Sequence, residues 1–154
     1  MKISAIILFC FLMLNSNVFS QNRVEADLGA GLFEGISLKV KYGNNVQVAI
    51  CQGFAQRSFW MTGVEGYFHF AGLSKHLDQR TFYVLMGFSG TLFAGGYDNF
   101  EKIILYSRVG KTFNFSEKSG LNLDAGAGIF WADDIDGYHP SVAPTFGFHY
   151  FRRF

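Results

Sequence analysis

The chain has 154 residues, enough for one domain, and its 13 Lys and Arg against 12 Asp and Glu give a formal net charge of +1. This balance excludes the strong electrostatic attraction by which basic proteins bind nucleic acid. Aromatic residues make up 18% of the chain, and 18 Gly accompany only 2 Pro, a composition that favours β-strands.

The first twenty residues predict a secretory signal peptide. Lys2 supplies the positive charge, and the apolar stretch ISAIILFCFLML that follows is too short to cross a bilayer as a helix. Val18 and Ser20 stand three and one residues before a plausible cleavage site at Gln21. We therefore expect residues 1–20 to be removed and residues 21–154 to form the folded domain. Within that domain Cys51 has no cysteine partner, and we interpret it as a small strand residue.

From residue 24 onward, apolar residues alternate with polar or small ones. In the first run Val24, Ala26 and Leu28 alternate with Glu25 and Asp27. This period of two predicts a strand with one apolar face. The same pattern predicts eight strands, at 24–32, 36–42, 46–54, 62–72, 81–95, 102–115, 120–132 and 141–154.

Short connectors join these runs, as an antiparallel up-and-down arrangement requires. YGNN, LSKHLDQ and SEKS would lie at one end, and FEG, QRSFW, GGYDNFE and DDIDGYH at the other. Pro144 conflicts with its strand because proline removes a ladder donor, so we expect a bulge there. No helical period appears after residue 20, and the fold class predicted is all-β.

Eight alternating strands can close into a barrel, either soluble with its apolar face inward or membrane-embedded with that face outward. The interior of such a barrel is only just wide enough for side chains to fill. The apolar face carries many aromatic residues, whereas the other face is rich in Gly, Ala and Ser. The apolar face is therefore expected outside, and the inner face would hold a paired network of charged and polar side chains: Glu25, Asp27, Lys39, Lys41, Glu65, His69, Arg108 and Asp124.

These features resemble the small outer-membrane β-barrel family, and the architecture is similar to that of the OmpA transmembrane domain. The resemblance implies a transmembrane barrel in a bacterial outer membrane, in contact with membrane lipids and lipopolysaccharide. It also implies that the alternating aromatic C-terminus is read by the barrel-assembly machinery, and the matching positions are Phe146, Phe148, Tyr150 and Phe154. Arg152 departs from the pattern because it takes an outward position, where it would have to snorkel to the interface.

The sequence supports a catalytic or metal site less well than it supports the barrel. Ser74, His76 and Asp78 have the residue types of a hydrolytic triad, but they share one turn, which we interpret as a polar hairpin tip. The segment ADDIDGYH resembles part of a calcium loop, yet Ala132 replaces the first carboxylate and the final Glu is missing. We interpret it as an acidic loop and expect no metal and no cofactor.

The sequence thus predicts an integral barrel with a structural or surface-interaction role, its lumen plugged by polar side chains, and without catalytic activity. Two alternatives stay open. One is a membrane-embedded lipid A hydrolase, although His69 and His149 fall on the inner face without a nearby Ser on the same strand. The other is a soluble lipocalin-like binding barrel, which would need an apolar interior.

Overall fold

The computed structural model describes residues 23–55, 59–74, 79–93, 102–134 and 137–154. The predicted signal peptide lies outside these residues, as do His76, Asp78 and Asp136. The side chains of Asp133, Asp134 and His139 are likewise outside the described part. In the part of the chain that is described, no helix is both long and apolar enough to cross a membrane.

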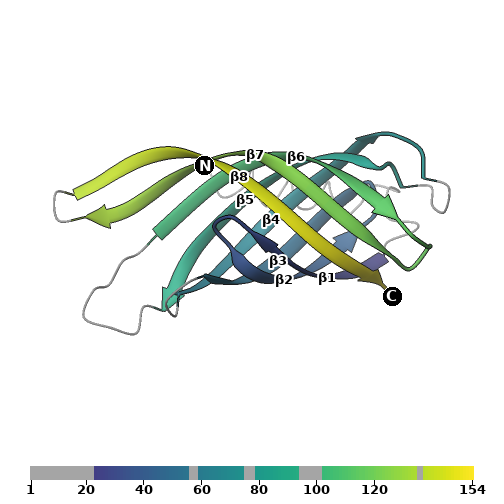
Figure 1. Cartoon of the computed structure of the whole chain (residues 1–154), viewed down its shortest axis with the longest axis horizontal. Helices are drawn as coiled ribbons and strands as arrows, with labels where there is room; N and C mark the ends of the chain where they lie inside the picture. The colour runs from purple at the N-terminus through teal and green to yellow at the C-terminus, as the bar shows by residue number, and fades with distance from the viewer. Residues whose placement is uncertain (1–22, 56–58, 75–78, 94–101, 135–136) are drawn as a thin grey trace, which may run out of the picture.

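Eight antiparallel strands close into one barrel (Figure 1). In chain order they are β1 (Arg23–Gly31), β2 (Gly35–Gly43), β3 (Val46–Ala55), β4 (Phe59–Ala71), β5 (Phe82–Phe93), β6 (Lys102–Asn114), β7 (Ser119–Asp134) and β8 (Gly137–Arg153). Each strand pairs with the next, and β8 pairs with β1 to complete the circle. The prediction of an eight-stranded up-and-down barrel is confirmed.

Side-chain alternation along the strands separates an apolar outside from a polar inside. Leu28 of β1, for example, is 59% exposed, whereas its neighbour Asp27 is 1% exposed. Because successive side chains point to opposite faces of a sheet, the period-two pattern places most of the large apolar strand residues outward. A smaller apolar set lies inside, including Met61, Leu85 and Ile104. The outside is therefore apolar and the inside holds the charged residues.

The strands differ in length, and this difference gives the barrel an uneven rim. β1 and β2 have 9 residues each, whereas β7 has 16 and β8 has 17. The β1–β8 pairing ends at Gly31 and Gly147, but the β7–β8 pairing continues to Asp134 and Gly137. In Figure 1 this hairpin extends at the left beyond the purple β1. The prediction that DDIDGYH forms a loop was wrong, because most of this segment belongs to β7 and β8.

Pro144 also differs from expectation, because no bulge forms there. The β7–β8 register runs without a shift, and Pro144 pairs with Ala127. The Phe146 carbonyl accepts a hydrogen bond from the Leu32 N–H at 3.1 Å. The backbone N–H and C=O of Phe146 therefore face β1. Pro144, two residues earlier, faces the same side but lies beyond the end of β1. The N–H that proline lacks would have had no strand partner there, which explains why the register is undisturbed.

A buried network as the candidate functional site

All eight residues predicted for the inner network lie inside the barrel. Each is less than a tenth exposed, and Lys39 and Glu65 are fully buried at 0%. They occupy inward positions of five strands, β1, β2, β4, β6 and β7, and β2 supplies both lysines. Charged groups are stable in such a place only when they are paired and hydrogen-bonded.

One group of charges, which we call the terminal cluster, joins the first, second and last strands. It consists of Glu25, Asp27, Lys41 and Arg153. The Lys41 ammonium lies 2.5 Å from Asp27 and 3.1 Å from Glu25, and the Arg153 Nε lies 2.8 Å from Glu25. The strand register explains this, because Glu25 stands opposite Lys41 on one side and Arg153 on the other.

A second group, which we call the central cluster, lies deeper and consists of Glu34, Lys39, Glu65, Arg108 and Asp124. Lys39 pairs with Glu65 at 2.8 Å, and Arg108 contacts Glu34 at 2.8 Å and Asp124 at 3.2 Å. Glu34 also lies 3.6 Å from Lys39, so its carboxylate connects the two ion pairs. Its oxygens are close to these cations without the alignment of a hydrogen bond.

Tyrosine hydroxyls complete the bonding of the central carboxylates. Tyr67 and Tyr106 donate to Glu65 at 2.5 and 2.6 Å, and Tyr83 donates to Asp124 at 2.9 Å. The two clusters contain five carboxylates and four cationic side chains. Neutral hydroxyl donors therefore stabilise the surplus negative charge.

Two glycines make room for these tyrosine rings. A Cβ on Gly87 would lie 2.3 Å from the Tyr106 ring, and one on Gly110 would lie 2.3 Å from the Tyr83 ring. Each glycine is the direct cross-strand partner of the tyrosine that covers it. The inward glycines noticed in the sequence thus allow large rings to lie flat inside a narrow barrel.

Further contacts fill both ends of the lumen. Toward the end where β1 begins, Gln79 donates to the Asn44 carbonyl at 2.9 Å and accepts from Arg153 at 2.9 Å. His69 contacts the Arg80 carbonyl at 2.8 Å rather than Glu65. Toward the other end, the rings of Phe33 and Phe130 pack with centroids 4.1 Å apart.

The structure also brings together a serine and a histidine from distant strands. The Ser37 Oγ lies 3.0 Å from the His149 Nε2, and both residues are buried. Glu34 approaches the same Nε2 at 3.7 Å, whereas a catalytic triad needs its carboxylate on the other ring nitrogen. The geometry is that of a hydrogen-bonded interior pair.

Sequence reasoning missed some members of the network for different reasons. The alternation of side chains along the strands places Tyr67, Tyr83, Tyr106 and Arg153 on the inner face, but the predicted network did not include them. Glu34 lies in the turn between β1 and β2, where no period applies, so no sequence signal identified it. The remaining triad candidate, Ser74, accepts a hydrogen bond from Asn114 at 3.0 Å.

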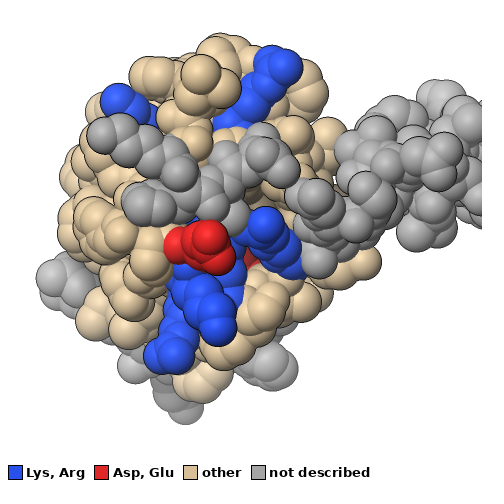
Figure 2. Space-filling model, turned by 90° about the vertical axis from the view of Figure 1, so that its right-hand side faces the viewer, with Lys and Arg blue, Asp and Glu red and all other residues tan. Residues whose placement is uncertain are grey.

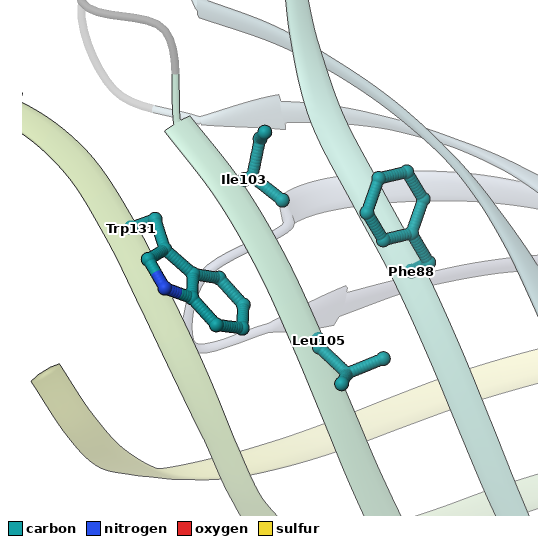
Figure 3. Close-up of a pocket in the computed structure, with 4 residues that line it drawn as sticks. All are labelled: Phe88, Ile103, Leu105 and Trp131. Carbon is teal, nitrogen blue, oxygen red and sulfur yellow. The ribbon is translucent and has the colours of Figure 1, made fainter. Parts of the chain in front are cut away.

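The outer surface carries the aromatic C-terminal row and shallow apolar hollows. Phe146, Phe148, Tyr150 and Phe154 are all exposed on the outside, and Arg152 lies exposed in the same row. Figure 3 shows one hollow on three neighbouring strands, with the Trp131 ring extending from β7 toward β6; its lining side chains are Phe88, Ile103, Leu105 and Trp131.

Among the described residues no group of three His, Cys, Asp or Glu is placed to hold a metal ion. Comparisons with protein-family models, with curated proteins and with solved structures find no match to this chain.

Proposed function

We propose that the chain is an integral β-barrel of a bacterial outer membrane, with a structural or surface-interaction role. The observation that carries this proposal is the apolar outer wall. Ile36, Ile50 and Met86, on three different strands, are each more than 60% exposed. Water-soluble monomers rarely expose a continuous apolar surface of this kind, whereas a lipid-facing barrel requires one.

The interior supports a plugged barrel. Ion pairs join β2 with β4 and Arg108 of β6 with Glu34 in the β1–β2 turn, and the tyrosine rings fill the space beside them. A soluble barrel of the lipocalin kind would need an apolar interior to hold its ligand, whereas the clusters found inside are charged. A lipid hydrolase is not favoured either, since Ser37 and His149 face inward, away from lipid.

The aromatic side chains near the strand ends fit the same proposal. Phe54 and Trp60 pack edge to face with centroids 4.9 Å apart on the outer wall, and aromatic rings are favoured at membrane interfaces. Within this proposal residues 1–20 direct export, Phe154 belongs to the signal for the barrel-assembly machinery, and lipopolysaccharide surrounds the loop end.

Membrane fractionation and gel mobility test the proposal. We expect the chain in the outer-membrane fraction, resistant to carbonate extraction, and migrating differently in a detergent gel before and after boiling. Lipids brominated on their chains should quench the fluorescence of Trp131 in a Trp60→Phe variant, because Trp131 faces outward. Recovery of the folded chain as a soluble periplasmic protein, with no quenching, would overturn it.

A further inference from the structure

A second shallow groove runs over the outer wall where β6, β7 and β8 lie side by side. Its depth comes from Ala125, a small outward residue that stands between Val109 of β6 and Phe146 of β8 in the strand register. The row beside it, toward the end of the barrel where β1 begins, contains Lys111 and Leu123. The groove is apolar along its floor and has one cation at its end.

Lys111 is held in place by aromatic rings. Its ammonium lies 4.9 Å from the centroid of the Phe82 ring and 5.0 Å from that of Phe113. None of the described carboxylates is within ion-pair distance of it. Phe82 and Lys111 also line a neighbouring hollow that includes Leu73 and Phe115. The ammonium is therefore a positioned charge, without an ion-pair partner among the described residues, where an apolar groove meets the rim.

The surrounding surface is also basic. Figure 2 shows the end of the barrel where β1 begins and β8 finishes, and Lys and Arg side chains gather there around a smaller acidic area. Arg80, Lys118 and Arg152 are exposed at this end. Basic side chains close to a membrane surface attract anionic lipid headgroups.

We propose that this groove binds an anionic glycerophospholipid, with the phosphate at the Lys111 ammonium and one acyl chain along Leu123, Ala125 and Phe146. The inference rests on the proposed membrane location. One ammonium matches the single phosphate of phosphatidylglycerol, and the apolar floor matches its chain. A second copy of the protein fits less well, because a two-fold contact centred on the groove would bring two Lys111 side chains together.

Native mass spectrometry of the detergent-purified barrel tests this site. The probes are phosphatidylglycerol and phosphatidylcholine with identical acyl chains, titrated separately. We expect the wild-type barrel to retain phosphatidylglycerol about five-fold more strongly, the effect of about one lysine near an anionic headgroup. Lys111→Gln should remove this preference and Lys111→Arg should keep it.

Two matched variants separate the groove from general charge. Lys118→Gln removes one positive charge from an exposed turn at the same end of the barrel and should lower the preference much less than Lys111→Gln does. Ala125→Leu should fill the groove and lower phosphatidylglycerol retention while the heat-dependent gel mobility stays as in the wild type. That mobility also verifies that each variant folds.

The site is overturned if both lipids are retained equally, or if Lys111→Gln keeps the preference. A dimer that Ala125→Leu abolishes would overturn it as well, by assigning the groove to a second copy. Failure of the membrane proposal is seen separately, in the fractionation of whole cells, and would remove the basis of the site.

Discussion

Glu65 shows how a buried charge is tolerated inside this barrel. Its carboxylate, fully buried, receives Lys39 at 2.8 Å and the hydroxyls of Tyr67 and Tyr106 at 2.5 and 2.6 Å. The Glu65 side chain therefore links three strands, β2, β4 and β6. The cost of taking the charge out of water is offset only while all these partners remain.

We therefore expect Glu65→Ala to be among the most destabilising single substitutions in the chain. It leaves Lys39 without its nearest partner and two tyrosine hydroxyls without acceptors. The free energy of unfolding should fall by about 3–5 kcal/mol. Urea titration of the barrel in lipid vesicles, followed by tryptophan fluorescence, measures the change.

Glu117→Ala is the matched control, since that carboxylate lies exposed on the turn between β6 and β7. It should leave the unfolding midpoint unchanged. Equal midpoints for Glu65→Ala and the wild type would contradict the role assigned to the central cluster.

The inner face was predicted well because side chains alternate between the two faces of a strand. Because side chains alternate strictly, the sequence alone indicated that Glu25, Lys39 and Arg108 point inward. It did not indicate which charge pairs with which, since pairing depends on the register between strands that are distant in sequence. Glu34 escaped prediction because a turn has no period, and its position becomes evident only when β1, β2 and β6 are assembled.

At the scale of elements, the β7–β8 hairpin is the feature that the sequence described least well. DDIDGYH has the composition of a loop, but pairing with the neighbouring strand carries both strands through most of it. Composition is a local property, whereas strand length depends on the partner. The order of the eight strands was predicted correctly, because alternation breaks between one strand and the next.

Pro140 and Pro144 both lie on the free edge of this hairpin, the edge of β8 that has no neighbouring strand. Pro140 and Pro144 face the side where β1 has ended, as the Phe146 hydrogen bond shows. Proline on an exposed strand edge prevents pairing with another chain, because it supplies no N–H donor. We interpret the two prolines as protection of an edge that the short β1 leaves uncovered.

A Pro140→Thr/Pro144→Thr double variant tests this interpretation. The two new N–H groups should allow edge-to-edge pairing, so dimers and larger species should increase in cross-linking and light-scattering experiments in detergent. The barrel itself should stay folded, since neither proline takes part in the β1–β8 ladder.

Val142→Thr is a suitable control, because it makes the same edge more polar without adding a backbone N–H. That variant should behave like the wild type. A double variant that remains as monomeric as the wild type would show that the prolines do not protect the edge.

For the whole molecule, the main consequence of the interior is a closed lumen. The terminal and central clusters lie one after the other along the barrel, and Phe33 and Phe130 pack at the end beyond them. Moving an ion through this interior would require breaking several buried ion pairs. The barrel should therefore not conduct ions.

Reconstitution into planar bilayers measures this directly. We expect no stepwise conductance from the inserted barrel under conditions in which a general porin gives clear steps. Gel mobility of protein recovered from the bilayer-forming vesicles verifies that it is folded. Reproducible single-channel steps from the wild-type chain would contradict the plugged interior.

The contact between Glu25 and Arg153 joins residues 128 positions apart in the chain. β1 is made before the other seven strands, but its second neighbour and one of its charge partners belong to β8, the last of the eight. Until then the chain has two open edges and an incomplete inner network, and no shorter product can close. A chain cut before β8 should consequently be a substrate for proteolysis rather than a smaller barrel. If the barrel is exported as proposed, the chain has to stay unfolded until β8 has arrived.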